Sequence, residues 1–522
     1  MNTFLIFLPV IVVMGIMVAI GFAVRKSSQK DRAVNFSKDY FIGGRSLGGF
    51  VFAMTVVATY VSVSSFVGGP GVAWNMGFGW VLLAMTQVLA IFPVMGVIGK
   101  KMAVIGRKID AVTVIDVIRV RYQSNLLANI AAVSLVVFFC GTMTAQFMGG
   151  ANIFAAAVQG MFGQTQVSLF GVEMNYNYLV GMFICAVVVI VFTSIGGFKA
   201  VALTDVFSAM IMLAGMGLIA YNILSQGGGM ENIMSFIATE QPHMLTPTAG
   251  GRISIQLLIS MWMLVGVLTI GLPQSLVRNM SYRSSSDLHR AMVYGTVIAG
   301  AMILGIHLLG VLSRAVVQEL PSGATTDFII PYLTVSHLPP FLAGIAITAP
   351  LIAAISTISS LLLAASSSII KDVYQHSLER RGFEVDQRKI GRLSTITTAL
   401  IGVICVAIAL QPPTIIIWVN MFAFGGLQTT FFWTFLLGFF WKRANLAGAL
   451  MSMVGGVLAY CYFMANAIPV YGFHHIVVGI GVGFVLFVIG SLLGSPTDEK
   501  VLKLFFPEQY PVGTKIEVPD KI

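Results

Sequence analysis

The sequence has little charge, few cysteines and no long polar stretch, and each shortage excludes a class of protein. Only 10% of the 522 residues are charged, whereas 57% are hydrophobic. A soluble domain carries about 25% charged residues. The four cysteines all lie inside apolar runs, so neither a disulfide framework nor a zinc site is indicated. The chain is therefore predicted to be an all-α polytopic membrane protein.

Sequence motifs of catalysis are also missing. GVIGKK at 96–101 lacks the spacing of a phosphate-binding loop, and no G-x-S-x-G elbow, H-E-x-x-H pair or paired Cys motif occurs. We therefore expect no enzymatic activity and no organic cofactor. The sequence also predicts no nucleic-acid partner and no obligate protein partner, so membrane lipids and a small solute remain as the expected partners.

The sequence does contain a series of apolar segments of about 20 residues, the length that spans a bilayer. The run at 3–24 has no basic region before it and no cleavage site, so it is expected to be a first span rather than a removable signal. Thirteen spans are predicted, at 3–24, 46–72, 77–98, 126–158, 178–195, 199–225, 253–281, 290–316, 339–372, 390–410, 414–441, 445–466 and 474–494.

The basic residues predict an orientation for these spans. If the N-terminus lies outside, every Lys and Arg except Arg252 and Arg314 falls on the cytoplasmic side, as the positive-inside rule requires. Membrane topology then explains the net charge of +10 without nucleic acid. We expect a multi-pass protein of a bacterial-type plasma (inner) membrane, with its C-terminus in the cytoplasm.

Ten of the spans form two sets of five, and because five is odd the second set is inverted in the membrane. Each set opens with an interrupted apolar segment, at Gly68-Gly69-Pro70-Gly71 and at Gly266, Gly271 and Pro273. Paired interruptions of this kind indicate a transporter's binding site. The predicted divisions are a first span with a basic loop (1–45), the first repeat (46–226), an extracytoplasmic loop (227–252), the second repeat (253–441), two peripheral spans (442–494) and a cytoplasmic tail (495–522).

The first polar constellation lies at 58–62, before the glycines of the first interruption. If the helix unwinds there, the free carbonyls of Ala58 and Val61 could bind a small hard cation, which prefers oxygen ligands. The alternative is an intact helix in which the hydroxyls bond back to i−4 carbonyls. The adjacent glycines favour the cation site.

Two further features lie inside apolar spans. Ser356 and Ser360 share one helix face, and with Thr357 they could complete the ligand shell of a sodium ion. The alternative is that these hydroxyls pack against neighbouring helices, and this pattern alone favours the alternative. Asp205 is an intramembrane carboxylate, which usually lines an ion pathway, although it could be a structural partner of Lys199 or of a backbone amide.

The remaining polar positions give weaker signals. Thr142 and Gln146 lie in a span otherwise rich in Val, Phe and Met, and Gln146 could face a solute. His307 is interpreted as a helix–helix contact. Arg278 lies near a predicted helix end, where its side chain is expected to extend to the membrane surface.

Several motifs together resemble the sodium:solute symporter family over nearly the whole chain. They include ATYVSVSSFVGGPG (58–71), GGFKAVALTD (196–205), GLPQSLVRNMSY (271–282) and APLIAAISTISSLLL (349–363). The resemblance implies a leucine-transporter-like fold with a five-plus-five inverted-repeat core, and secondary active import of a solute with Na⁺ as the coupling ion. It also implies pantothenate as the solute, with another small carboxylate or nutrient as the alternative. A sensor or a channel is less favoured, because the tail is short and no continuous polar stripe occurs.

The resemblance also implies functional residues, and it reverses the packing interpretation of residues 353–368. The sodium ligands would be Ala58, Val61, Ala353, Ser356 and Thr357. Asp205 would mark a second sodium position or the ion's exit route. Relatives place aromatic gate residues in the region that here reads 265–270 and lacks them. Gate and solute contacts are therefore not transferred, and the expected solute-side residues are Thr59, Ser62, Ser65, Thr142, Gln146 and Thr269.

Overall fold

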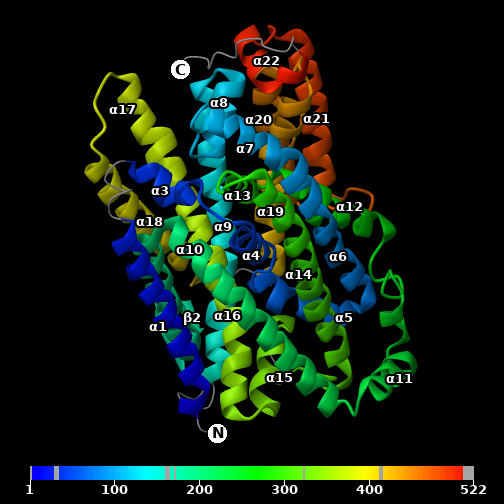
Figure 1. Cartoon of the computed structure of the whole chain (residues 1–522). Coiled ribbons are helices and arrows are strands. Elements are labelled where there is room, and N and C mark those ends of the chain that lie inside the picture. Colours follow the sequence, from blue (N-terminus) through cyan, green and yellow to red (C-terminus); the bar gives the residue numbers. More distant parts are fainter. Residues whose placement is uncertain are drawn as a thin grey trace.

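The computed structural model describes residues 3–28, 35–158, 165–169, 172–320, 324–410 and 416–509. Nearly all of these residues are helical, and most helices run along the long direction of the molecule (Figure 1). The first residues of the span expected at 414–441, part of the basic loop in 1–45 and the tail beyond 509 lie outside the described residues.

The first half of the chain contains the first interrupted helix and two very long helices. Its elements are α1 (Thr3–Ser27), α3 (Phe36–Ile42), η1 (Gly43–Arg45), α4 (Gly49–Tyr60), η2 (Ser64–Gly68), α5 (Gly69–Met76), α6 (Phe78–Phe92), η3 (Pro93–Gly99), α7 (Lys100–Lys108), α8 (Val114–Tyr122), α9 (Asn125–Val158), β1 (Gln166–Leu169), β2 (Val172–Asn175), α10 (Tyr176–Gln226) and α11 (Met230–Glu240).

The second half contains the second interrupted helix. Its elements are η4 (Pro242–Leu245), α12 (Ile255–Val265), η5 (Val267–Gly271), α13 (Pro273–Arg278), α14 (Ser285–Leu312), η6 (Ser313–Ala315), η7 (Thr326–Phe328), α15 (Ile329–His337), α16 (Pro340–Ser367), η8 (Ser368–Gln375), α17 (His376–Arg380), α18 (Gln387–Ala409), α19 (Ile416–Phe440), α20 (Leu446–Ala465), α21 (Ile476–Leu493), α22 (Glu499–Phe505) and η9 (Pro507–Gln509).

Within the described residues, ten helices are long and apolar enough to cross a membrane, or eleven if the bent pair that starts with α4 counts as one span. Thirteen segments were predicted, and the difference has two causes. The 51-residue α10 covers two predicted spans, which Gly197 separates with φ 71° and ψ −172°, a conformation that glycine adopts readily. The predicted span 253–281 is divided into α12, η5 and α13. The chain is a multi-pass membrane protein.

Two local features were missed by the sequence analysis. Strands β1 and β2 pair antiparallel before α10, with Val167 opposite Met174. The predicted loop 227–252 contains α11, whose Ile233 and Ile237 are both buried. Residues at i and i+4 share one helix face, so these two side chains attach α11 to the rest of the protein.

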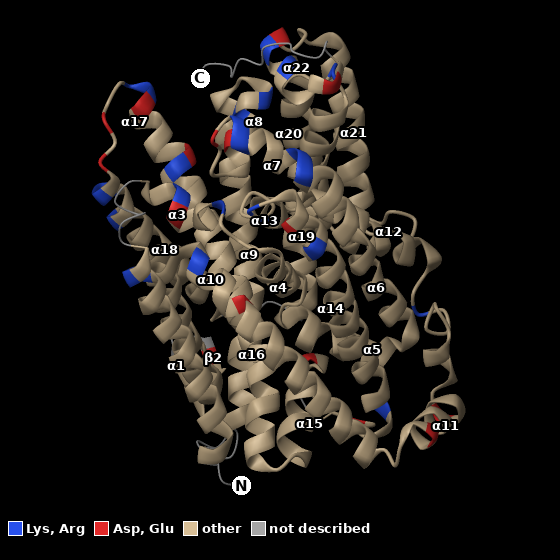
Figure 2. Ribbon diagram, in the orientation of Figure 1, with Lys and Arg blue, Asp and Glu red and all other residues tan. Residues whose placement is uncertain are grey.

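Basic residues are distributed unevenly along the molecule. Figure 2 shows most Lys and Arg residues at the end that carries α3, α7, α8, α17 and α22, whereas the end with α11 and α15 has few. We call the first the basic end. Helix α1 begins at the other end, while α22 lies at the basic end (Figure 1), as expected for an odd number of crossings.

One acidic residue between spans fixes an end of α19. Asp327 in η7 is 3% exposed, and one of its carboxylate oxygens accepts a hydrogen bond from the Ile416 amide at 3.1 Å. A carboxylate at a helix N-terminus is favoured by the helix dipole. Burial nevertheless raises the pKa of the Asp327 carboxyl to about 6, partly offset by the Ile416 amide.

Candidate functional site

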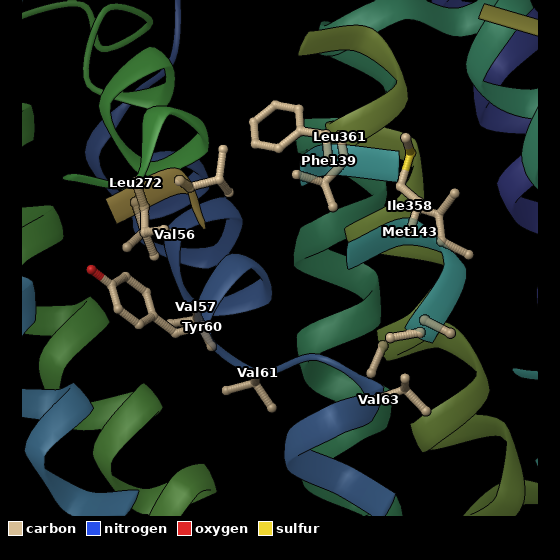
Figure 3. Packing of buried hydrophobic residues seen from close by; sticks show 14 of the residues in the cluster. Val56, Val57, Tyr60, Val61, Val63, Phe139, Met143, Leu272, Ile358 and Leu361 are labelled. Carbon is tan, nitrogen blue, oxygen red and sulfur yellow. The ribbon is translucent and has the colours of Figure 1, made fainter. Parts of the chain in front are cut away.

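The first interruption lies between α4 and η2, upstream of the glycines that were predicted to cause it. Helix α4 ends at Tyr60, Val61 has φ −104° and ψ 87°, and η2 starts at Ser64. The two helical parts differ in direction by 56°. Figure 3 shows the chain running without helical turns from Tyr60 past Val61 to Val63.

The glycines of the first interruption have a different role from the predicted one. Gly68 and Gly69 are in right-handed helical conformation and connect η2 directly to α5. A Cβ atom on Gly69 would overlap the ring of His307, and one on Gly71 would overlap the backbone of Thr326. These glycines therefore allow neighbouring elements to approach the helix closely.

The interruption leaves backbone oxygens available for a cation. The Val61 amide donates to the Val57 carbonyl at 2.9 Å, and the Ser65 and Phe66 amides both donate to the Ser62 carbonyl at 3.0 Å. In the described part of the chain, no backbone amide donates to the carbonyl of Ala58 or Val61. Oxygen atoms that lack an intrahelical partner suit a small hard cation.

A side chain from another helix stabilises the interruption. The Val63 amide donates to Gln146 Oε1 at 3.1 Å, and Gln146 Nε2 donates to Ser64 Oγ at 3.2 Å. Gln146 lies on α9 and is fully buried. It was predicted to face a solute; it lines the cavity described below, but its amide group is also part of the support for the interruption.

The second interruption occurs where the glycines predicted it. Helix α12 ends at Val265, with Gly266 as its C-cap. Within the break, the Thr269 amide donates to the Gly266 carbonyl at 3.1 Å and the Leu272 amide donates to the Thr269 carbonyl at 3.0 Å. Gln428 Nε2 of α19 donates to the remaining Leu264 carbonyl at 2.7 Å.

A cavity lies between the two interruptions and is lined by residues of both, together with residues of α9, α16 and α19. All six residues predicted to face the solute line it, which brings together α4, η2, α9 and η5: Thr59, Ser62, Ser65, Thr142, Gln146 and Thr269. The cavity walls also include residues that were not predicted to face the solute: Tyr60, Ser64, Gln87, Val265, Leu272, Gln274, Ser275, Arg278, Ser360, Leu361, Ile417, Asn420, Met421 and Phe424.

Two of these additional residues have polar atoms without partners. Gln274 on α13 is 5% exposed and Asn420 on α19 is 6% exposed. The side-chain oxygen of each makes no hydrogen bond to any described residue. A buried polar atom without a partner costs about 1–3 kcal/mol, so both atoms are suited to a polar ligand in the cavity.

The predicted sodium ligands belong to α4, to the break directly after it and to α16, and α4 and α16 are in contact. Ala58, Val61, Ala353 and Ser356 are at most 1% exposed, whereas Thr357 lines the cavity. Thr357 Oγ1 donates to the Ala353 carbonyl at 2.9 Å, which leaves the hydroxyl oxygen lone pairs available. The set offers only neutral oxygen atoms, the chemistry that a sodium ion requires.

Asp205 lies at the centre of a buried polar cluster. Thr55 Oγ1 donates to Asp205 Oδ2 at 2.5 Å, and the Ser356 hydroxyl donates to Asp205 Oδ1. Arg278 Nη2 lies 3.7 Å from Asp205 Oδ2 and donates to Ser360 Oγ at 2.6 Å. The shared face predicted for Ser356 and Ser360 is therefore the face that contacts this ion pair.

The cluster corrects two interpretations of the sequence. The ion-pair partner of Asp205 is Arg278, not Lys199. Arg278 was expected to extend to the membrane surface, but it is only 2% exposed and lies between helices. A charged residue inside a span is a functional candidate by default. Arg278 was missed because the predicted span hid the turn of η5, which directs α13 inward.

Three comparisons with known proteins agree with this architecture. The model of the family described as "Sodium:solute symporter family" matches residues 40–456. The chain is 39% identical over 490 residues to the sodium/pantothenate symporter of Escherichia coli (strain K12), covering 94% of this chain and 96% of that protein. It is 36% identical over 467 residues to the sodium/pantothenate symporter of Haemophilus influenzae, covering 89% of this chain and 92% of the relative.

The fold is also found in a solved structure, that of a Na⁺-coupled sialic acid symporter in a substrate-bound outward-open state. The match has a TM-score of 0.78 and 19% sequence identity, and it covers 95% of this chain and 98% of the other. The predicted leucine-transporter-like fold is thereby confirmed. This chain belongs to the sodium:solute symporter family: it is a membrane transporter that moves a small solute together with sodium, and not an enzyme.

Proposed function

We propose that this protein imports pantothenate across the bacterial plasma membrane by symport with sodium. The observation that carries the proposal is the cavity between the two interrupted helices, whose wall carries polar side chains from both of them, among them Ser62, Ser65 and Thr269. Two relatives that share more than a third of their residues with this chain are named as sodium/pantothenate symporters. The basic end is proposed to face the cytoplasm, in accordance with the positive-inside rule.

The proposed sodium site uses the oxygens that the first interruption leaves open. Sodium is bound by the carbonyls of Ala58, Val61 and Ala353 and by the hydroxyls of Ser356 and Thr357. Occupation of the site joins α4 to α16 and favours the arrangement that is open to the outside. The solute then enters the cavity, and the outer side closes around it.

The proposed solute site has two chemically different parts. Helix η2 begins at Ser64 beside the cavity, and a half-helix N-terminus there attracts the carboxylate of pantothenate without a free cationic side chain. Gln274 and Asn420 are proposed to bind the hydroxyl and amide groups of the solute, since their side-chain oxygens are buried and without partners. Thr59, Ser62, Ser65, Thr142, Gln146 and Thr269 provide the remaining polar wall.

Asp205 is proposed to act on the sodium pathway from beside the first site. Both of its oxygens already accept hydroxyl donors, and Arg278 balances its charge. A second sodium ion at this carboxylate would have to displace Arg278. We therefore propose one sodium per pantothenate anion, which makes transport electrically neutral.

The test is uptake of labelled pantothenate into proteoliposomes, with and without an inward sodium gradient, at zero and at negative inside potential. We expect uptake that requires sodium and is insensitive to the membrane potential, because one sodium ion with one anion moves no net charge. Each net charge moved would gain about 2.3 kcal/mol per 100 mV. Uptake that rises with potential indicates a second sodium. If saturating pantothenate leaves all sodium-dependent uptake intact, the solute is another small carboxylate or nutrient.

A further inference from the structure

The cavity between the interruptions is separated from a second, smaller cavity by a thin partition. The smaller cavity is also lined by Phe198 and by Phe41 of α3, a helix at the basic end (Figure 2). Gln274, Arg278 and Ser360 line both cavities. These three side chains therefore lie between the solute cavity and the smaller one.

The partition is held closed by hydrogen bonds from Arg278. Its Nη2 donates to Ser360 Oγ at 2.6 Å, and its Nε donates to Thr55 Oγ1 at 3.2 Å. Asp205 lies 3.7 Å from the same Nη2 and is fully buried. The guanidinium group thus connects α13 to α4, α10 and α16 at one point, and its planar shape allows several directed bonds at once.

The same cluster reaches the proposed sodium site through one hydroxyl group. Ser356 donates its only hydroxyl hydrogen to Asp205. A hydroxyl that binds a cation directs its hydrogen away from the cation, so sodium at Ser356 strengthens the bond to Asp205. Asp205 then stays in the position that pairs with Arg278. Without sodium the Ser356–Asp205 bond lacks this reinforcement.

We propose that Arg278 is a positioning residue that closes the solute cavity toward the basic end, and that Asp205 links its position to sodium bound at Ser356. The inference rests on the sodium site of the proposed function but not on pantothenate as the solute. It explains how release of sodium permits release of solute on the same side.

The test measures access to the cavity without any solute. Ser275 lines the solute cavity but not the smaller one. Ser275→Cys is placed in a chain whose native cysteines, at 140, 185, 405 and 461, are replaced by alanine. A membrane-impermeant maleimide is applied from the face with the basic end, in sodium or in choline. Labelling is expected to be about tenfold slower in sodium.

Ser360→Ala removes the 2.6 Å bond and leaves the ion pair in place, and we expect fast labelling in both salts. The matched control is Ser359→Ala on the same helix, whose hydroxyl donates to the Ile355 carbonyl at 2.8 Å; it should be labelled like the parent. Arg278→Lys keeps the charge but not the planar fork, so its rate in sodium should be intermediate.

The proposal is overturned if Ser360→Ala is labelled slowly in sodium and faster in choline, as the parent is. Equal labelling of Ser360→Ala and Ser359→Ala would overturn it as well. Since no solute is present, an incorrect solute assignment does not change the labelling result. That error is detected separately by the uptake and competition measurements.

Discussion

The two interrupted helices occupy corresponding positions in the two sets of five helices, yet they are stabilised differently. At the first interruption, the amide of Val63 bonds to the side chain of Gln146 on α9. At the second, the Thr269 and Leu272 amides bond to carbonyls within the break itself, and Gln428 on α19 donates to the Leu264 carbonyl. An unpaired backbone group inside a membrane costs several kcal/mol, so both solutions are needed, but their consequences differ.

Because they are stabilised differently, the two interruptions present different chemical groups. A break that is supported from another helix keeps carbonyls such as those of Ala58 and Val61 free for a cation. The second break forms hydrogen bonds of its own at the Gly266 and Thr269 carbonyls, and it is followed by α13, which places a charged side chain, Arg278, between helices. The first interruption is the side suited to sodium, and the second carries the partition.

The largest effect is expected at the second interruption. Arg278→Gln leaves Asp205 buried without its cationic partner, which should destabilise the protein by about 3–5 kcal/mol. The double variant Asp205→Asn/Arg278→Gln leaves neither charge alone and should recover part of this loss. Thermal unfolding of the purified protein measures both. Equal unfolding temperatures for the single and double variants would contradict the pairing.

A paired substitution compares the two supporting glutamines directly. Gln146→Leu leaves the Val63 amide unpaired, which should cost about 1–3 kcal/mol and raise the sodium concentration for half-maximal uptake about tenfold. Gln428→Leu leaves the Leu264 carbonyl unpaired and should lower stability similarly without changing the sodium dependence. The measurements are sodium titrations of uptake together with unfolding temperatures. The distinction fails if both variants shift the sodium dependence equally.

A smaller effect is expected from removing one hydroxyl ligand at the first interruption. Thr357→Ala should raise the sodium concentration for half-maximal uptake several-fold. The lost contact between the hydroxyl and sodium is taken to contribute about 1 kcal/mol, as a single hydrogen bond does. Ser356→Ala should act in the same direction. Thr348→Ala is the control, since this hydroxyl on the same helix donates to the Gly344 carbonyl at 2.6 Å, away from the site. An unchanged sodium dependence in Thr357→Ala would remove it from the ligand set.

The smallest effect concerns η2 and α5, the part of the first interrupted helix that follows the break and contacts η7. Burial raises the pKa of Asp327 to about 6, so the folded state favours the protonated carboxyl. The stability that this protonation contributes is present below about pH 4 and is lost as the pH rises through about 6. Asp327→Asn should remove this dependence, a change of a few degrees in unfolding temperature measured from pH 4 to pH 7. An identical pH profile would show that Asp327 does not titrate there.

Much of the site was predictable because its residues are polar positions in apolar runs. The six expected solute-side residues line one cavity, although their contact with solute stays a prediction. The first break begins within 58–62, where unwinding was considered, and not at the glycines of 68–71. Its support was not predictable, since the Val63 amide bonds to Gln146, 83 positions away in the sequence. Gln274 and Asn420 were not predicted, because the sequence around each amide does not indicate that its side chain lines a cavity.

The sequence by itself determined that this is a many-helix membrane protein, that two of its segments are interrupted, and that Asp205 stands out among apolar residues. These properties follow from composition and spacing, which act locally along the chain. Only the tertiary structure decided that Asp205 pairs with Arg278 and that Ser356 and Ser360 contact that pair from one helix face. A buried charge must find a partner wherever the packing of helices provides one, and that packing brings together residues from distant parts of the chain.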